Sequence, residues 1–177
     1  MFKEGRSMRE KIFEAKDVVI KFNLRGHTLT AIRGASIDLY DGETLAIVGE
    51  SGSGKSVFTK SFIGMLDTNG WVERGEMLLD GVNIAKYKTE KEWLKVRGKK
   101  IAMVFQDPMT SLNPVMTVAD QIAEVIRLHD GGSRAEAHRK ACDMLELVGI
   151  RPERGSDYPH QFSGGMKQRV VIAMALA

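Results

Sequence analysis

The sequence predicts an α/β fold in which a glycine-rich loop joins a buried strand to a helix. A short apolar run at residues 44–48 continues directly into the glycine-rich stretch 49–56, and a helix-forming segment follows it. A second short apolar run, at 101–105, is also typical of a strand that is buried on both faces. In 117–129 and 134–148 the apolar residues recur at the spacing of an amphipathic helix. Buried strands interspersed with such helices indicate the α/β class.

Turn residues and apolar periodicity delimit the other elements. The dipeptide Asp80-Gly81 favours a tight hairpin turn, Asp41-Gly42 marks another turn, and Gly149 is expected to end the helix before it. The remaining expected elements, in chain order, are strands at 12–22 and 29–39, a helix at 57–66, a hairpin at 76–84, a short helix at 90–96 and a helix that begins near 164.

The composition is that of a folded protein with one substantial core. The chain has 177 residues, of which 43% are hydrophobic and 28% charged, so we do not expect the chain as a whole to be disordered. The single cysteine, Cys142, excludes an internal disulfide and a cysteine-built metal site within these residues, and it favours a reducing compartment. No signal peptide is expected at the start, and the longest apolar stretch, 170–177, is far shorter than the ~20 residues of a membrane span. Any role at a membrane is therefore expected to involve a partner.

Positive charge gathers in one segment. Residues 86–100 contain seven Lys and Arg against Glu90 and Glu92, whereas the whole chain has a formal net charge of +3. Such a segment is most often a solvated face, and a phosphate-rich partner such as lipid headgroups or nucleic acid is the alternative. No recognisable nucleic-acid-reading module accompanies the segment, so we expect no nucleic acid partner.

The stretch from Gly49 to Ser56 matches the phosphate-binding P-loop pattern. Its glycines let successive backbone N–H groups point inward as a nest for an anion. Lys55 brings a mobile positive charge to the outer phosphates, the Ser56 hydroxyl is a ligand for Mg²⁺, and the following helix adds its positive N-terminal end. A chance glycine-rich turn is the alternative, against which the preceding strand and the following helix argue. The expected nucleotide-binding residues are Gly49, Glu50, Ser51, Gly52, Ser53, Gly54, Lys55 and Ser56.

A second glycine motif lies near the C-terminal end of the sequence. Ser163, Gly164 and Gly165 precede an apolar helical stretch, so a hydroxyl group and two residues without side chains stand at a helix N-terminus. This arrangement is another site for an anion. Taken alone it is a weak signal, because the same tripeptide more often forms a flexible turn or a helix cap.

Three motifs in one order resemble ABC-type ATPases. The stretch 162–169, Phe-Ser-Gly-Gly-Met-Lys-Gln-Arg, resembles their signature motif, and 103–108, Met-Val-Phe-Gln-Asp-Pro, resembles their Q-loop. Both follow the P-loop, as in that family. The amino-acid sequence of 105–114 and 158–166 is most similar to that of the ATP-binding subunits of oligopeptide and dipeptide importers, and nickel importers share much of it. The resemblance covers nearly the whole chain.

The resemblance implies a P-loop NTPase fold of the ABC ATPase type, with an antiparallel β arm and a helical subdomain. Residues 1–105 would form the N-terminal part of the nucleotide-binding core with the β arm and the P-loop, 106–161 the Q-loop and the helical subdomain, and 162–177 the signature motif and the start of its helix. In that family two further strands separate the strands expected here at 44–48 and 101–105. The core sheet is therefore expected to be incomplete, with a marginal fold or an unusual oligomer as the result.

By resemblance, two such subunits form a head-to-tail dimer, identical or related, with ATP and Mg²⁺ between the P-loop of one and the signature motif of the other. Ser163 and Gly165 would contact the γ-phosphate of the partner's ATP. Ser56 and Gln106 would hold Mg²⁺, and Gln106 would also reach the attacking water and sense a membrane permease. The signature residues facing the partner's ATP would be Ser163, Gly164, Gly165 and Met166.

An aromatic residue upstream of the P-loop stacks on adenine in that family. Phe22 is the first candidate for this role and His27 the second. The plainer interpretation of Phe22, a core aromatic residue on a strand, stays open beside it.

The resemblance also implies a function. The chain would be an ATP-binding subunit that energises the import of peptides, or of a similar small solute, through membrane permease subunits at the cytoplasmic face of the cell membrane. Two other interpretations stay open, a soluble ABC-type ATPase without a permease and a non-catalytic nucleotide-binding fragment.

The residues that hydrolyse ATP in that family follow the signature motif. They are the Asp of the Walker B strand, the catalytic Glu after it and a switch His further on. In this sequence the last acidic residue is Asp157 and the last histidine is His160. We therefore expect the chain to bind ATP but to hydrolyse it poorly alone, and we assign no catalytic residue.

Overall fold

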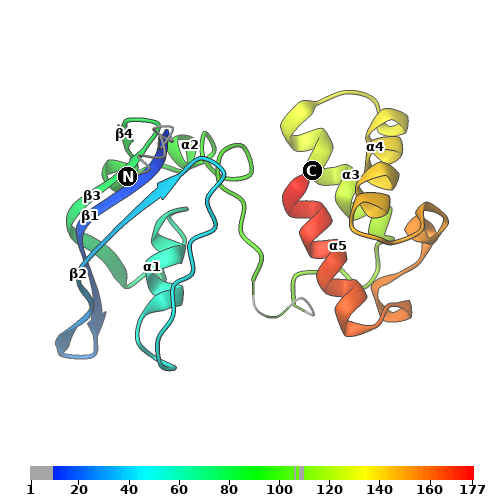
Figure 1. Ribbon diagram of the computed structural model, residues 1–177. Coiled ribbons are helices and arrows are strands. Elements are labelled where there is room, and N and C mark those ends of the chain that lie inside the picture. The colour runs from blue at the N-terminus through cyan, green and yellow to red at the C-terminus, as the bar shows by residue number, and fades with distance from the viewer. Residues whose placement is uncertain (1–9, 106, 108–109) are drawn as a thin grey trace, which may run out of the picture. The chain divides into compact units, whose positions relative to one another are not determined.

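The computed structural model describes residues 10–105, 107 and 110–177 (Figure 1). The described chain divides into two units, the first ending at Val96 and the second extending from Arg97 to Ala177. The first unit contains a β-sheet and the glycine-rich loop, and the second is built from helices.

The sheet of the first unit has four antiparallel strands in the order β2-β1-β3-β4. Their bounds are Lys11–Leu24 for β1, His27–Tyr40 for β2, Gly70–Leu79 for β3 and Val82–Asn83 for β4. The strands expected at 12–22 and 29–39 and the hairpin at 76–84 are confirmed. Asp80 and Gly81 form the hairpin turn with φ values of 48° and 77°. This sheet is the antiparallel β arm that the resemblance implies.

Aromatic and apolar side chains join the sheet to α1, which spans Lys55–Ser61. The rings of Phe13 on β1 and Phe62, just after α1, have centres 4.6 Å apart. Met77 of β3 is fully buried, and its Sδ lies 3.6 Å from the hydroxyl oxygen of Ser61. This packing holds α1, and with it the end of the glycine-rich loop, against the sheet.

Two short helical turns complete the first unit, η1 at Ile84–Lys86 and α2 at Glu90–Trp93. The second is shorter than the helix expected at 90–96. Its capping box is formed by Thr89 and Glu92. The backbone N–H of Lys88, the Thr89 hydroxyl and the Thr89 backbone N–H donate to Glu92 and hold the pKa of its carboxyl below the ordinary value. This carboxylate therefore caps a helix within the basic segment.

Two expected strands are missing from the described residues. Residues 44–48 have no regular structure, and Val48 is 87% exposed. In 101–105 only Ile101 forms a bridge, to Arg97, and Phe105 is 37% exposed. The interior strand of a sheet needs partners along both edges, and no described residue pairs with 44–48. The prediction of two buried strands is therefore wrong for the described residues.

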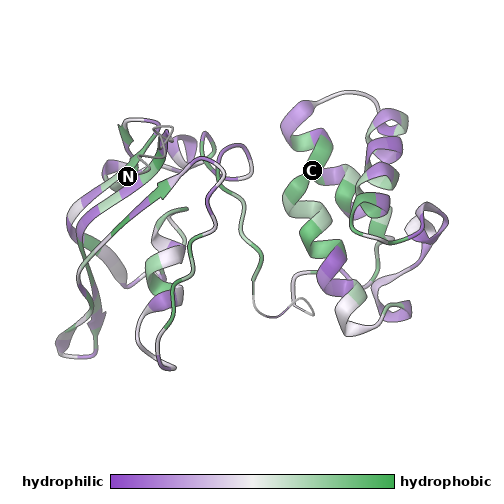
Figure 2. Cartoon of the chain, in the orientation of Figure 1, coloured by the Kyte–Doolittle hydropathy of each residue, from purple (hydrophilic) through white to green (hydrophobic). Residues whose placement is uncertain are grey.

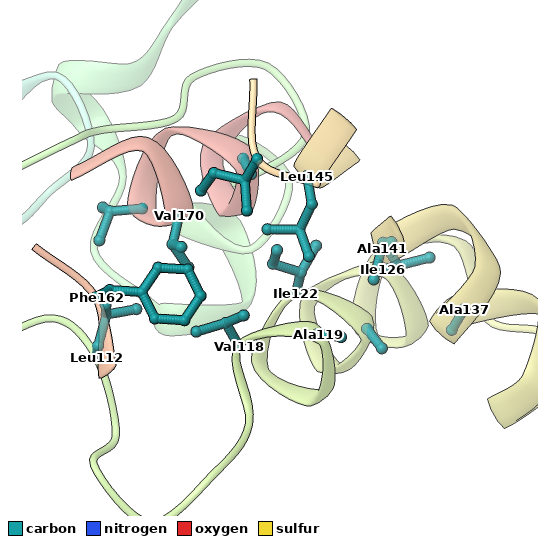
Figure 3. Packing of buried hydrophobic residues seen from close by; sticks show 14 residues of the cluster. Leu112, Val118, Ala119, Ile122, Ile126, Ala137, Ala141, Leu145, Phe162 and Val170 are labelled. Carbon is teal, nitrogen blue, oxygen red and sulfur yellow. The ribbon is translucent and has the colours of Figure 1, made fainter. Parts of the chain in front are cut away.

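The second unit consists of helices around one apolar cluster. Its helices are α3 (Val118–Asp130), α4 (Arg134–Leu147), η2 (Pro152–Ser156), η3 (Pro159–Gln161) and α5 (Gly164–Leu176). The expected helices at 117–129, at 134–148 and from 164 onward are confirmed. Ile122 of α3, Leu145 of α4 and Val170 of α5 are fully buried in the cluster, which Figure 3 shows from close by.

The first turns of α5 differ from the rest of the helix. Lys167, Gln168 and Arg169 lie near its start, and apolar residues fill the remainder, as the colours of Figure 2 show. Val170 and Val171 begin the buried part. The apolar end therefore anchors the helix and leaves its N-terminal turn at the surface.

No helix in the described part of the chain has the length and apolar character needed to cross a bilayer.

Local hydrogen bonds end α4 where the sequence predicts. Ser133 caps its start, and Gly149 follows its end with a φ of 74°. The Gly149 N–H donates to the Glu146 carbonyl, and the Ile150 N–H donates to the Leu145 carbonyl, each at 2.9 Å. These two bonds form a Schellman motif, so the helix stop expected at Gly149 is confirmed.

Candidate functional site

The glycine-rich loop leads directly into α1. Gly54 precedes the helix and adopts a left-handed conformation with a φ of 92°. The helix begins at Lys55, two residues earlier than the expected helix at 57–66, and it ends at Ser61. Residues 49–53 are exposed, so the backbone of the loop is accessible to a ligand.

The ammonium group of Lys55 lies within the curve of this loop. Its Nζ donates to the carbonyl oxygens of Gly49 at 2.8 Å and Glu50 at 2.7 Å, and it lies 3.3 Å from the hydroxyl oxygen of Ser53. One cation therefore connects the first and last parts of the loop. A fixed positive charge beside exposed backbone N–H groups is the arrangement that binds a phosphate.

Close approach of neighbouring atoms favours glycine at two positions of the loop. A Cβ atom at Gly54 would lie 2.6 Å from Cδ1 of Ile32 and 3.2 Å from the carbonyl oxygen of Ala31. A Cβ atom at Gly49 would lie 2.9 Å from the hydroxyl oxygen of Ser53. The lack of a Cβ atom at these two positions therefore lets the loop curve tightly, as the P-loop pattern predicts.

A cavity of about 760 Å³ adjoins the loop within the first unit. Its lining consists of Phe22, residues 29–35 of β2, Gly52 to Gly54 and Val57. Nothing in the sequence marks the contribution of β2, because pairing within the sheet decides which strand lies beside the loop. The cavity is large enough for a small organic ligand whose anionic end occupies the loop.

Phe22 is a buried aromatic residue of a strand and also borders the cavity, so both interpretations of this residue agree with its position. It is 9% exposed and stands between Leu29 of β2 and Gly70 of β3 in the register of the sheet. A Cβ atom at Gly70 would lie 2.5 Å from Cε1 of Phe22, so the ring covers that glycine and also borders the cavity. His27 is exposed at the first position of β2, outside the cavity lining.

The hydroxyl group of Ser56 is the candidate protein ligand for a divalent cation at this loop. Ser56 is exposed in the first turn of α1, beside Lys55. Within the described ranges no group of three or more His, Cys, Asp and Glu residues could hold a metal ion. Mg²⁺ is commonly bound by one or two protein groups together with substrate phosphates and water. Gln106, the other expected Mg²⁺ ligand, lies outside the described residues.

The second glycine motif forms the start of α5 in the second unit. The hydroxyl oxygen of Ser163 accepts a hydrogen bond from the backbone N–H of Met166 at 3.4 Å. Gly164 and Gly165 follow, and a Cβ atom at either position would meet nothing within 4 Å. The cap and both glycines are exposed, so this helix start can approach another molecule closely.

Cys142 is the single cysteine of the chain, and its thiol is free. It is partly buried, with its Sγ 3.8 Å from Nδ1 of His138. Burial raises the pKa of the Cys142 thiol, with smaller contributions from the nearby Asp143 and Glu153. The thiol is therefore a poor nucleophile at neutral pH.

A family model described as "ABC transporter" matches residues 32–177 of the chain. Among curated proteins, the oligopeptide transport ATP-binding protein AmiE of Streptococcus pneumoniae is 51% identical over 168 residues, covering 94% of this chain and 47% of the relative. The dipeptide transport ATP-binding protein DppD of Lactococcus lactis is 49% identical over 171 residues, covering 95% and 49%. The chain thus spans about half the length of the curated relatives it matches.

Solved structures give the same relationship at the level of the fold. The dimeric post-hydrolysis structure of the ATP-binding cassette MJ0796, bound to ADP and Pi, has a TM-score of 0.79 at 30% identity and covers 93% of this chain and 69% of its own. CbiO1 of Clostridium perfringens, described as part of the ABC transporter complex cbiONQ, has a TM-score of 0.76 at 26% identity and covers 94% and 61%.

Proposed function

The chain belongs to the ABC transporter family, and from this premise we propose that its first unit binds ATP with Mg²⁺. One observation carries the proposal. The ammonium group of Lys55 is held by the carbonyl groups of Gly49 and Glu50, inside an exposed loop that borders a cavity. This geometry places a positive charge where the triphosphate would lie.

Each part of the loop has a distinct task in this proposal. Backbone N–H groups of the loop and of the first turn of α1 donate to phosphate oxygens, and Lys55 offsets the negative charge of the phosphates. The hydroxyl group of Ser56 binds Mg²⁺, which supplies further neutralisation of the phosphates. The residues that would bind ATP are Gly49, Glu50, Ser51, Gly52, Ser53, Gly54, Lys55, Ser56 and Phe22.

We assign the adenine end of the nucleotide to Phe22. Its ring borders the same cavity as Gly52 to Gly54, whereas His27 stands outside the lining. The side of the Phe22 ring that carries Cε1 lies against Gly70 and stays in the sheet, so the part of the ring toward the cavity makes the contact. The cavity lining is what favours Phe22 over His27.

We propose that the second unit serves the ATP of another subunit. Ser163, Gly164, Gly165 and Met166 would face that nucleotide across a dimer with an identical or related ABC ATPase subunit. The exposure of Ser163 and of both glycines supports this role, and the related MJ0796 is described as dimeric. Gln106 would reach Mg²⁺ and connect the site to a membrane permease.

We further propose that this subunit energises peptide import through permease subunits, at the cytoplasmic face of the membrane. The relatives named for oligopeptide and dipeptide transport match 94% and 95% of the chain, with 51% and 49% of the aligned residues identical. These names favour peptide import over a soluble ABC-type ATPase without a permease. Nickel or another small solute is the alternative cargo, and the match to peptide-transport relatives argues against it.

Calorimetric titration with a series of nucleotides in the presence of Mg²⁺ tests the proposal. Because the loop contacts the phosphates, we expect ATP and ADP to bind and AMP to bind at least about tenfold more weakly. Equal binding of all three nucleotides would place recognition on the nucleoside and contradict the role of the loop. If none of the three nucleotides bound to a folded sample, the proposed function would be contradicted.

We expect the 177-residue chain alone to release phosphate from Mg-ATP at no more than a residual rate. Hydrolysis requires a metal held in place and an oriented water molecule. In the family pattern the carboxylates for these tasks follow the signature motif, and the last acidic residue of this sequence is Asp157. Phosphate release measured with and without Lys55→Ala checks this expectation. A Lys55-dependent turnover of about 1 s⁻¹ or more, within the ordinary range of enzymes, would show that another carboxylate does this work.

A further inference from the structure

Arg154 contacts the segment around Ser163 on both of its sides. It belongs to η2, and its Nε donates to the Asp157 carboxylate at 2.8 Å. Its Nη2 donates to the carbonyl oxygen of Gln161 at 3.1 Å, before Ser163. Its Nη1 lies 3.6 Å from Sδ of Met166, after Ser163. One planar side chain therefore connects three points of the segment that leads into α5.

The same guanidinium group covers a residue of the apolar cluster. It lies 4.4 Å from the ring centre of Phe162, the residue directly before Ser163. Phe162 is 5% exposed and packs in the cluster with Leu112 and Val118, as Figure 3 shows. The ring is thus anchored by the core and held from outside by a cation over its face.

The exposed glycines make no side-chain contacts of their own. Gly164 and Gly165 are the first two residues of α5, and they have no side chain that could pack against a neighbour, so their direction depends on the helix backbone and on the residues that flank it. The Ser163 cap depends on the backbone N–H of Met166, whose side chain Arg154 contacts. Asp157 is itself tied to the start of α3, because its carbonyl oxygen accepts from the N–H of Val118 at 3.0 Å.

We propose that Arg154 is a positioning residue that fixes the direction in which Ser163, Gly164 and Gly165 are presented. The inference rests on the proposed contact of these residues with the ATP of the partner subunit. Arginine is required because its fork reaches Asp157 and Gln161 at once, with an aromatic ring beneath it. A lysine at this position has a single Nζ and keeps only the charge.

Amide hydrogen exchange without nucleotide tests the positioning in the full chain. In Arg154→Ala and in Arg154→Lys we expect exchange of the Met166 and Lys167 amides, whose N–H groups donate to Ser163, to rise about tenfold, the loss of roughly one charge-assisted hydrogen bond. Arg151→Ala is the matched control, because Arg151 is exposed three residues earlier, and it should leave this exchange unchanged. Wild-type exchange in Arg154→Ala would overturn the proposal.

Nucleotide measurements on the same variants separate positioning from general stability. We expect Mg-ATP affinity to stay within about twofold of wild type, since the P-loop is in the other unit, and ATP-dependent pairing seen by sedimentation to weaken about tenfold. Arg154→Lys should recover the thermal stability that Arg154→Ala loses, without recovering the pairing. If Arg154→Lys showed both the exchange and the pairing of wild type, the requirement for a guanidinium group at this position would be overturned. If wild type binds ATP and does not pair, the proposed pairing of identical copies is contradicted, and the exchange measurement decides the role of Arg154 by itself.

Discussion

Replacing Lys55 by alanine is expected to weaken Mg-ATP binding by about 100-fold, which corresponds to roughly 2.7 kcal/mol. The Lys55 ammonium lies on the carbonyl groups of Gly49 and Glu50, where it faces the inside of the loop. Without it, the backbone N–H groups alone must offset the charge of the phosphates. Calorimetry with Mg-ATP measures the change, and circular dichroism confirms that the variant is folded.

Lys60→Ala is the matched control for this variant. Lys60 is in the last turn of the same helix α1, so its removal changes the net charge of the chain by the same amount. We expect its affinity for Mg-ATP to stay within about twofold of wild type, because exposed charges at a distance are screened by salt. Equal losses in the two variants would show that net charge, and not the position of Lys55, governs binding.

Gly54→Ala is expected to remove most nucleotide binding and to destabilise the first unit by about 2–3 kcal/mol. The φ of 92° is strained for any residue with a Cβ atom, and that atom would lie 2.6 Å from Cδ1 of Ile32. Relief of the clash moves the loop away from β2 and changes the cavity. Both tryptophans, Trp71 and Trp93, are in the first unit, so urea unfolding followed by their fluorescence reports on that unit.

Gly42→Ala separates backbone strain from the shape of the loop. Gly42 also has a left-handed conformation, with a φ of 66°, but nothing lies within 4 Å of its Cβ position. We expect a loss of about 1 kcal/mol in stability and unchanged affinity for Mg-ATP. If Gly54→Ala bound ATP as well as Gly42→Ala does, the close approach of the loop to β2 would have no part in binding.

Elements with a local signal could be predicted from the sequence. The three long helices, the strands of the antiparallel sheet and the turn at Asp80-Gly81 follow from periodicity, caps and turn residues. The P-loop pattern also predicts where glycine is needed, and the structure places close contacts at Gly49 and Gly54. These features depend on residues near one another in the chain, which sequence patterns capture.

Features that depend on distant partners could not be predicted in the same way. The apolar composition of 44–48 and 101–105 favours buried strands, but a strand also needs neighbours, and the described residues supply none for 44–48. Likewise, the cavity lining from β2 and the contacts of Arg154 arise from tertiary packing. The domain boundaries expected at 105 and 161 from the resemblance remain predictions.

Amide hydrogen exchange with and without saturating Mg-ATP tests most directly whether the loop at 49–56 holds the triphosphate. Protection is expected in 49–56, with a smaller effect in 29–35 of β2, while α4 exchanges as before because it belongs to the other unit. Lys55→Ala should abolish the protection. Unchanged exchange in 49–56 at a nucleotide concentration where calorimetry shows binding would place ATP elsewhere on the chain and contradict the assignment of the loop.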